Sequence, residues 1–413
     1  MIRPFLIKIN ELLLGRKKTI LMLVSGIFWL AALAYSVYMA DRLPYPDERW
    51  YFNDYAQNLA GLHIFSQDGI TPTAFHPPIY PVFLGIIVSL GFGVTTARLL
   101  NFLMLFLTLF CLFNLLENRS HKLASILAVL LALGYPVLFY TAGTLYPQTF
   151  GALFFILAIL LYWKNPFTAK NALLAGIALG IAILTIPTFL FVPFFLVLFS
   201  IFIRKDTLAK TGLLFIMVFV TIAPWTARNY LVFNRFILVS SNFGTNFIIG
   251  NSPATTPNNG PAASFGVIPI MEESNHLGLD EFERDKFYTK QALMFIQQDP
   301  KHYIILYFLK VVNYFNFRNE LLTVSESSLA KDLLMLLTYG LLLLVAIIRM
   351  FFFQQHLFSK LEIFLVLLYI SSAFISALAF SRIRYRLPFD YLLIVLVAMF
   401  IEKIFLEKVQ VIA

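Results

Sequence analysis

Long apolar runs dominate this chain and limit the folds that it can adopt. Of its 413 residues, 60% are hydrophobic and 13% are charged, and the mean hydropathy is +0.80. A soluble domain of this size would expose far more charge. Because an α-helix needs about 20 apolar residues to cross a bilayer, the sequence predicts an all-α polytopic membrane protein with about ten transmembrane helices. The expected spans are residues 19–40, 97–116, 123–141, 148–163, 171–186, 188–203, 211–227, 332–350, 361–380 and 387–405.

Basic residues between the runs predict which helix ends face the cytoplasm. Clusters of Lys and Arg in alternate loops agree with the positive-inside rule when both termini are cytoplasmic. The first apolar run is longer than the core of a signal peptide, which favours an uncleaved first helix. The clusters assigned to the cytoplasm are Arg16-Lys17-Lys18, Arg119/Lys122, Lys164/Lys170, Arg204-Lys205 with Lys210, Arg349/Lys360 and Lys403/Lys408.

Two further apolar segments are expected to stay at the outer surface. Residues 77–90 are short and begin with prolines, so we expect a helix that dips into the outer leaflet and returns. Residues 302–317 predict a membrane-lying helix. The predicted parts are 1–40, the cytoplasmic N-terminus and first span; 41–95, the first outer loop with the dipping helix; 96–227, a transmembrane core; 228–330, a second outer loop with the membrane-lying helix; and 331–413, the C-terminal spans with an arginine-rich outer loop.

The composition and motifs exclude several classes of function. The formal net charge of +9 comes from scattered Lys and Arg without a basic stripe, which argues against nucleic acid as a partner. Cys111 is the single cysteine, so an intrachain disulfide is excluded. The chain has no phosphate-cradling glycine loop with lysine, no serine elbow and no HExxH. Its histidines form no cluster with ligand spacing, so no metal site is predicted, although a divalent cation stays open as a cofactor.

Asp47 and Glu48 are the first candidates for catalysis. They follow the first span directly, in a chain with few acids, and aromatic residues flank them on both sides. Carboxylates beside a bilayer are costly unless they are solvated or paired, and near a cavity they are functional candidates. The alternative is a solvated turn in which the acids cap a short helix.

Arginines in two outer segments are candidates for binding an anion. Arg382, Arg384 and Arg386 lie between the last two spans, and Arg228 lies at the outer end of another. All four lie against the positive-inside rule. Guanidinium groups bind phosphate through paired hydrogen bonds, and a lipid phosphate would lie at this depth. The alternative is that the arginines reach to lipid headgroups as ordinary interfacial residues.

One carboxylate opposite a group of arginines suits the transfer of a sugar from a lipid phosphate. A phosphate leaving group needs charge stabilisation rather than a general acid, whereas the attacking hydroxyl needs a base. Hydrolysis of a glycoside would require a second, protonated carboxyl. The residues therefore favour sugar transfer. A lipid-linked-sugar flippase or transporter, which needs no base, is the alternative.

Several motifs, in order along the chain, resemble bacterial GT-C glycosyltransferases of the protein O-mannosyltransferase-like family, which includes the aminoarabinose transferase acting on lipid A. The motifs are Asp47-Glu48, Thr73-Ala-Phe-His-Pro-Pro-Ile-Tyr-Pro81, Ala223-Pro-Trp-Thr-Ala-Arg-Asn-Tyr230, Asn242-Phe-Gly-Thr-Asn-Phe, Gly250-Asn251 and Arg384-Tyr-Arg-Leu-Pro388. The resemblance implies a GT-C fold and an inverting transferase on the outer face of the bacterial inner membrane. Its donor would be a polyprenyl-phosphate sugar, and its acceptor a hydroxyl of lipopolysaccharide, another envelope glycan or a protein.

The resemblance also implies roles for single residues. Asp47 would be the general base, with Glu48 beside it in the site. Many members carry a further acid in the second outer loop, where this chain has Gln148, and this leaves a metal-assisted role open. The expected ligands of the donor phosphate are Arg382, Arg384, Arg386 and Arg228. The expected substrate pocket contains Tyr51, His76, Tyr80, Tyr146, Gln148 and Asn251.

Overall fold

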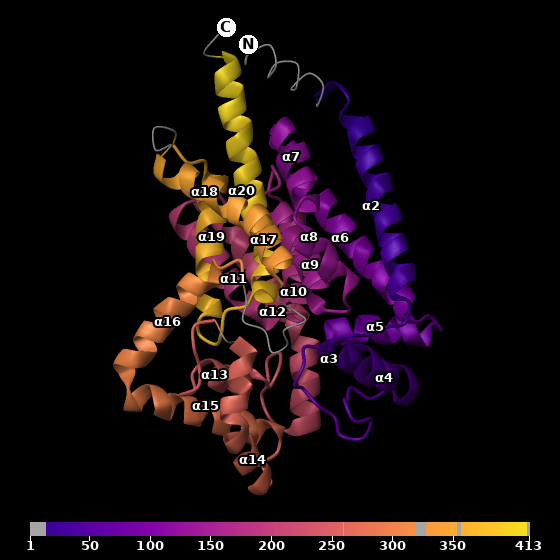
Figure 1. Ribbon diagram of the computed structural model, residues 1–413, viewed down its shortest axis with the longest axis vertical. Coiled ribbons are helices and arrows are strands. Elements are labelled where there is room, and N and C mark those ends of the chain that lie inside the picture. Colours follow the sequence, from indigo (N-terminus) through magenta and orange to yellow (C-terminus); the bar gives the residue numbers. More distant parts are fainter. Residues whose placement is uncertain (1–13, 259, 319–327, 353–356, 411–413) are drawn as a thin grey trace.

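The described part of the chain is helical. The computed structural model describes residues 14–258, 260–318, 328–352 and 357–410, and within these ranges the only pairing of β type is an isolated bridge between Ser66 and Pro72. Figure 1 shows the long helices packed as a bundle, with both termini at one end and the short helices α3 to α5 and α13 to α15 at the other. The prediction of an all-α membrane protein is confirmed.

Every predicted span coincides with a helix or with consecutive helices. By length and composition, four helices can each cross a bilayer: Lys17–Met39, Val94–Glu117, Lys205–Phe233 and Leu329–Phe351. The helices on the predicted spans are α2 (Lys17–Met39), α6 (Val94–Glu117), α7 (Lys122–Leu133) with α8 (Pro136–Gly143), α9 (Pro147–Tyr162), α10 (Ala169–Ile183), η2 (Pro187–Phe191) with α11 (Val192–Phe202), α12 (Leu208–Phe233), α17 (Leu329–Met335) with η6 (Leu336–Gly340) and α18 (Leu341–Phe352), α19 (Lys360–Ser376), and α20 (Ile383–Gln410).

The span predicted at 123–141 is a broken helix. α7 ends at Leu133 and α8 begins at Pro136, with a bend of 60° between the two axes. Proline has no backbone N–H, and its ring clashes with the preceding turn, so a helix does not continue straight through it. The break leaves Tyr135 buried in the bundle, where its hydroxyl reaches Asp390 of α20.

Short helices build the end of the bundle away from the termini. The chain leaves α2 through α3 (Pro46–Arg49), a π-helical turn η1 (Trp50–Ala56) and α4 (Gln57–Leu62). α5 (Ile79–Ser89) lies across the bundle end in Figure 1, and its 11 residues are too few for a span. The segment between α12 and α17 contains α13 (Phe243–Gly250), η4 (Gly260–Val267), α14 (Ile268–His276), α15 (Glu281–Gln298) and α16 (Pro300–Tyr314). The last of these coincides with the predicted membrane-lying helix.

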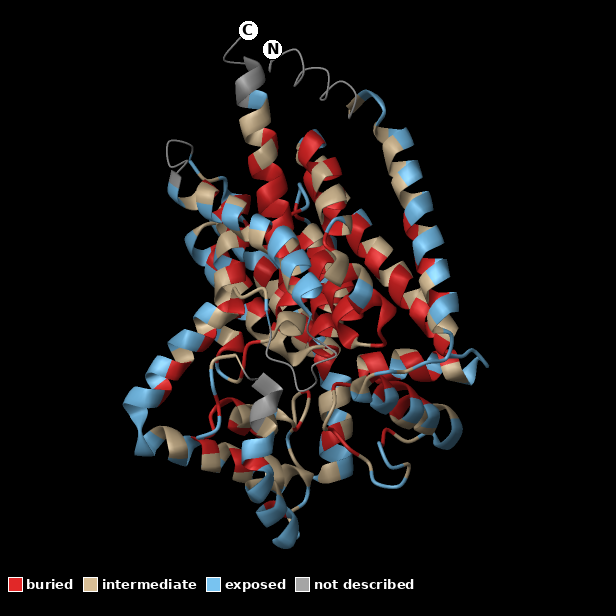
Figure 2. Ribbon diagram, viewed as in Figure 1, coloured by how far each residue is buried: buried red, intermediate tan, exposed pale blue. Residues whose placement is uncertain are grey.

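Burial distinguishes a packed core from lipid-facing helices. Figure 2 shows buried residues concentrated in the middle of the bundle, while much of α2 is exposed. Glycines allow α10 to approach α12 closely: a Cβ at Gly176 would lie 2.7 Å from the carbonyl oxygen of Leu214, and one at Gly180 would lie 2.6 Å from Cβ of Thr221. Small residues permit such contacts where lipid supplies no hydrophobic driving force. The central helices are therefore a firm support for the loops at their ends.

The side of the membrane that each end faces stays a prediction, and thiol labelling tests it. We expect Gly260→Cys and Ile383→Cys to react with a membrane-impermeant reagent from outside, and Lys164→Cys to react only after the membrane is permeabilised. The native Cys111 is buried and should contribute little background. Protection of residue 260 or 383 until permeabilisation would contradict the predicted topology.

Candidate active site

Asp47 and Arg384 form an ion pair at the bundle end opposite the termini. Nη1 of Arg384 lies 2.5 Å from Oδ2 of Asp47, although 337 positions separate the two residues. Asp47 belongs to α3, and Arg384 belongs to the first turn of α20. Their side chains are 26% and 27% exposed, so a ligand can reach the pair. The structure thus joins one predicted acid to one predicted arginine.

Arg384 retains hydrogen-bonding capacity beyond this pair. Nη2 donates to the hydroxyl of Tyr385 at 3.2 Å, whereas the buried Nε–H has no acceptor among the residues that the structure describes. The guanidinium lies 5.4 Å from the ring centroid of Tyr146 and 5.1 Å from that of Tyr385, within the range of a cation–π contact. A held guanidinium with an unused donor in a partly exposed site is suited to an anionic ligand.

Glu48 is engaged with the backbone. It is fully buried; one carboxylate oxygen accepts from the N–H of Tyr45 at 3.1 Å, and the other accepts from the N–H of Leu145 at 3.0 Å. The first contact caps α3, and the second ties α3 to the segment that precedes α9. Burial raises the pKa of Glu48, and these two N–H groups oppose that rise. Glu48 therefore positions its neighbours Asp47 and Tyr146.

Removing the Glu48 carboxylate is expected to destabilise the protein. In Glu48→Ala the buried N–H groups of Tyr45 and Leu145 lose their acceptor, and each unpaired group costs about 1–3 kcal/mol. We expect a lower midpoint of thermal unfolding in detergent for this variant. Asp41→Ala, which removes an exposed acid nearby, serves as the control. An unchanged midpoint for Glu48→Ala would contradict the positioning role.

Tyr51, His76 and Tyr80 form an aromatic group near the ion pair. The ring centroid of Tyr51 lies 5.3 Å from that of His76 and 5.5 Å from that of Tyr80. Nδ1 of His76 lies 3.1 Å from the hydroxyl of Tyr55. The charges of Asp47 and Arg384 both act on the pKa of Tyr51 and of His76, which places these two rings beside the pair. These predicted pocket residues thus gather around Asp47.

His76 should be neutral in the folded protein. Burial lowers its pKa from 6.5 to about 4; the charge of Asp47 opposes this shift, and the charge of Arg384 adds to it. At neutral pH the ring therefore supplies one N–H donor and one acceptor and no charge. A neutral imidazole can orient a hydroxyl group of a ligand without adding charge beside Arg384.

This lowered pKa predicts acid sensitivity. Between pH 6.5 and about 4 the unfolded chain binds a proton at His76 that the folded chain does not bind, so stability falls as the pH is lowered through this window. We expect wild-type protein to lose more of its thermal midpoint than His76→Gln when the pH is lowered through this window. Equal losses would show that His76 does not contribute.

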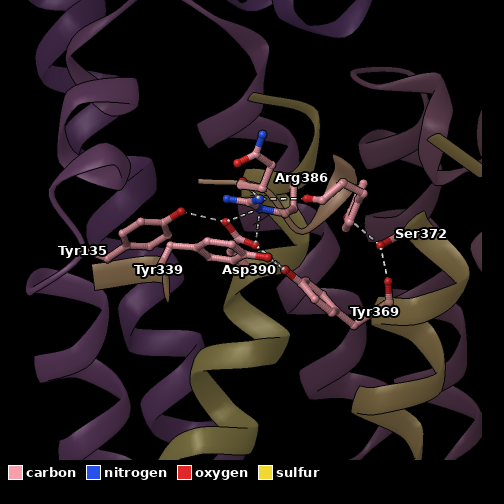
Figure 3. Close-up of polar contacts among 8 residues, drawn as sticks. Tyr135, Tyr339, Tyr369, Ser372, Arg386 and Asp390 are labelled. Atoms are coloured by element: carbon pink, nitrogen blue, oxygen red, sulfur yellow. Dashed lines mark hydrogen bonds and ion pairs between the residues drawn. The ribbon is translucent and has the colours of Figure 1, made fainter. Parts of the chain in front are cut away.

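Arg386 lies in a buried network on α20, shown in Figure 3. Its Nε lies 3.1 Å from Oδ1 of Asp390, and its Nη1 donates to the carbonyl oxygens of Tyr314 at 2.7 Å and Asn316 at 2.5 Å. Asp390 also accepts from the hydroxyl of Tyr369 at 2.8 Å. Arg386 is only 1% exposed, and its Nε and Nη1 bind protein groups, whereas its buried Nη2 has no partner in the described part of the chain. The network fixes the start of α20, which carries Arg384.

Arg228 lies with a different set of contacts. Its Nη1 donates to the carbonyl oxygen of Thr73 at 2.9 Å, and its guanidinium lies over the ring of Trp225 at 4.8 Å. Glu281 holds the same loop, accepting from the N–H of Ala74 at 3.0 Å and from the hydroxyl of Thr73. Within the described residues, Arg228 makes no contact with the Asp47–Arg384 pair. It joins α12 to the loop before α5 instead.

Asn251 contacts Lys310, which is also outside the ion pair. Lys310 is buried, and its Nζ donates to Oδ1 of Asn251 at 3.1 Å and to the carbonyl oxygens of Gly250 at 2.9 Å and Ala379 at 2.7 Å. Three acceptors match the three donors of an ammonium group. These bonds tie α16 and the end of α13 to the loop that leads into α20. Asn251 thus helps to hold the loop that precedes Arg384.

Gln148 and Arg382 complete the predicted set. Gln148 lies in the first turn of α9, is 6% exposed, and its Oε1 has no hydrogen-bond donor in the described part of the chain. Arg382 is half-buried immediately before α20. No group of three or more His, Cys, Asp or Glu residues that could hold a metal ion occurs within the residues described here.

Three positioning residues were not predicted from the sequence: Arg98, Glu281 and Asp390. Arg98 is fully buried and donates to the carbonyl oxygens of Ala40 at 2.6 Å and Gly143 at 2.8 Å, which fixes the exit from α2. Asp390 carried a usable signal, since an acid inside an apolar span needs a partner and Arg386 lies four residues before it. Arg98 binds backbone carbonyl groups, and Glu281 binds two hydroxyl groups and one backbone N–H, so neither has a charged partner that the sequence could suggest.

The chain is similar to a family model and to solved structures. Residues 75–227 match the family model described as dolichyl-phosphate-mannose-protein mannosyltransferase. Two solved structures are similar to the chain: the crystal structure of ArnT from Cupriavidus metallidurans bound to undecaprenyl phosphate (14% identity, TM-score 0.44, covering 94% of this chain and 78% of that one) and its apo state (15%, 0.42, 94% and 77%). No curated protein matches the chain in sequence.

The match of residues 75–227 to a mannosyltransferase family model, together with the helical membrane fold, supports a glycosyltransferase similar to the GT-C class. The resemblance drawn from the sequence motifs is thereby confirmed. The family model covers α5 to α12 and includes His76, Gln148 and part of the motif at Ala223, whereas Asp47 and Arg384 lie outside the matched residues.

Proposed function

We propose that this protein transfers a sugar from a polyprenyl-phosphate donor to a hydroxyl of a cell-envelope acceptor, on the outer face of the bacterial inner membrane. The ion pair between Asp47 and Arg384 is the observation that carries the proposal. It joins a carboxylate, which can take a proton, to a guanidinium, which can bind a phosphate. The family model supports a lipid-phosphate donor, because its description names a dolichyl-phosphate sugar.

In the proposed reaction Asp47 is the general base. It removes the proton of the acceptor hydroxyl while the hydroxyl oxygen attacks the anomeric carbon of the donor sugar. The bond from that carbon to the phosphate oxygen breaks, and polyprenyl phosphate leaves with the bonding electrons. Arg384 stabilises the negative charge that develops on the leaving phosphate. Attack from the face opposite the phosphate inverts the anomeric carbon.

Because Asp47 is paired with Arg384 before substrate binds, the donor takes part in activating Asp47 as the base. In the resting pair Oδ2 of Asp47 is occupied by the guanidinium of Arg384, so this oxygen is not available to a substrate hydroxyl. The donor phosphate competes for Arg384, whose Nε–H is already unused. When the guanidinium turns to the phosphate, Asp47 is released to accept the acceptor proton. Donor binding would therefore precede activation of the base.

The four predicted phosphate ligands receive different roles in this proposal. Arg384 binds the phosphate, and Arg382, two residues earlier, supports the local positive potential. Arg386 and Arg228 position the site, because their guanidinium groups are bound to Asp390 and to Thr73. Tyr51, His76, Tyr80 and Tyr146 form the wall beside the donor sugar. Gln148, which has an unused Oε1, offers an acceptor for a sugar hydroxyl.

A reconstituted assay separates transfer from the flippase alternative. Purified protein in liposomes is supplied with a polyprenyl-phosphate sugar that carries a labelled sugar, together with candidate envelope acceptors. The proposal expects label to move from the lipid to an acceptor and free polyprenyl phosphate to accumulate in equal amount. Movement of intact donor between leaflets, without release of polyprenyl phosphate, would support the flippase instead. The sugar is identified by the lipid-linked species that accumulates in cells lacking the protein.

A further inference from the structure

A polar cavity lies at the other end of the bundle from the Asp47–Arg384 pair. It has a volume of about 610 Å³ and is lined by the turn between α6 and α7, the residues after α9, the turn between α11 and α12, and the first turn of α19. Met399 of α20 is also in its wall. Because Met399 follows Arg384 by 15 positions on one helix, the two sites are about 22 Å apart along the axis. Figure 1 shows α7 beginning near the end that carries the termini.

Two arginines of this cavity are held in fixed positions by uncharged groups. Nη1 of Arg119 donates to the carbonyl oxygen of Trp163 at 2.9 Å, and Nη1 of Arg204 donates to that of Tyr162 at 2.9 Å. Both guanidinium groups lie over the indole ring of Trp163, at 4.7 Å and 4.5 Å from its centroid. No described carboxylate forms an ion pair with either arginine, and each has further N–H donors that these contacts do not use.

The positive charges of Arg119 and Arg204 repel each other when no anion is bound between them. Burial, and next the charge of Arg204, lower the pKa of Arg119. The cavity wall also contains Lys164 and Lys360, with Asp206 as the one acidic residue and His121 paired to Glu402 at 2.6 Å. Four basic groups against one acidic group give the cavity a positive potential.

An unpaired buried donor also lies in the wall of the cavity. Trp163 is 3% exposed, and its indole N–H has no acceptor within the described part of the chain. Buried N–H groups are almost always paired with protein, water or a ligand. A charge that served only to orient the protein in the membrane would need neither a fixed guanidinium nor a buried N–H. These features resemble a built anion site more than a solvated basic loop.

We propose that this cavity binds a phosphate group, held by the guanidinium groups of Arg119 and Arg204 and by the indole N–H of Trp163. Phosphate oxygens accept paired hydrogen bonds from guanidinium groups, and lysines at the rim add charge. The cavity lies at the membrane end that carries most of the basic residues, so the phosphate is that of an anionic lipid headgroup in the adjoining leaflet. A bound headgroup would link α6, α9, α11 and α19 at their ends. This site is independent of the sugar-transfer function.

Lipid retention by the purified protein tests the proposal. Protein is purified from mixed liposomes of phosphatidylglycerol and phosphatidylcholine, and bound lipid is measured by native mass spectrometry. We expect retained phosphatidylglycerol to fall at least about tenfold in Arg119→Lys/Arg204→Lys, which preserves both charges and the topology but removes the paired donors. Trp163→Phe should give a smaller loss. The matched control, Lys170→Gln/Lys210→Gln, removes two charges at the same end outside the cavity and should retain the lipid.

Inorganic phosphate distinguishes the source of the bound group. If millimolar phosphate raises the thermal midpoint of wild type but not of the arginine variant, and no lipid is retained, the site takes a soluble phosphate. Retained phosphatidylglycerol that depends on Arg119 and Arg204 assigns the site to a lipid headgroup. Lipid retention and phosphate response that are equal in wild type and the arginine variant, or a loss of retention as large in the lysine control, would overturn the proposal.

Discussion

Asp47→Asn is expected to lower the rate of sugar transfer by about 10²–10⁴-fold, because the amide cannot accept the proton of the acceptor hydroxyl. The protein should remain folded, since the lost contact is a partly exposed ion pair, which contributes about 0–1 kcal/mol to stability. The measurement is the initial rate of transfer from a labelled polyprenyl-phosphate sugar by purified, reconstituted protein. Thermal unfolding of the same preparation checks the fold.

The same variant tests whether the ion pair restrains Arg384. In Asp47→Asn no carboxylate competes with the donor phosphate for Arg384. Donor affinity should therefore stay the same or increase by up to about fivefold, which corresponds to about 1 kcal/mol. Asp41→Asn removes an exposed acid of the same loop and should affect neither quantity. Full transfer activity in Asp47→Asn would contradict the assignment of Asp47 as the general base. Normal transfer with much weaker donor binding is also incompatible with the proposal.

Much of the fold follows from the sequence because a bilayer leaves few choices. In lipid each backbone polar group must be paired within the protein, so an apolar run of sufficient length becomes a helix. The runs at 19–40 and 97–116 became α2 and α6 with ends shifted by only a few residues. The break between α7 and α8 was missed at the sequence level, although Gly134 and Pro136 are residues that end helices.

The sequence predicted most residues of the candidate site but not which of them contact one another. The predicted topology puts Asp47, Arg228 and the arginines at 382–386 on one side of the membrane, but it gives no distance between them. Arg384 meets Asp47, whereas Arg386 meets Asp390. Two positions along α20 turn the side chain by about 200°, which is enough to send one arginine to the site and the other into the core.

Local helix geometry gives the adjacent acids Asp47 and Glu48 different contacts. Consecutive residues of a helical turn point about 100° apart, so both cannot face Arg384. Glu48 occupies the third position of α3, from which its carboxylate reaches back to the N–H of Tyr45. This leaves Asp47 for Arg384. The capping pattern was hidden in the sequence because Tyr45 is not one of the usual capping residues.

Arg384→Ala is expected to weaken donor binding, because the leaving phosphate loses a charge-assisted contact of about 1.5–3 kcal/mol, or roughly 10- to 150-fold in affinity. The measured loss should be smaller than the full value of this contact, because in wild type the donor must first displace Asp47 from Arg384. Arg384→Lys keeps the charge but not the planar fork, so its donor affinity should be intermediate. Donor binding is measured by competition with a labelled polyprenyl phosphate.

A double-mutant cycle decides whether Arg384 acts through the phosphate or only through Asp47. If its role is to hold the carboxylate, Arg384→Ala should have no effect on donor binding in the Asp47→Asn background. If it binds the phosphate, the loss in that background should equal or exceed the loss in wild type, because no competing carboxylate remains. Arg284→Ala, which removes a half-buried arginine of α15 outside the site, is the matched control and should leave donor binding unchanged. Unchanged donor binding in Arg384→Ala itself would move the phosphate to Arg382 or Arg228, and would require these groups to leave the contacts that they make in this structure.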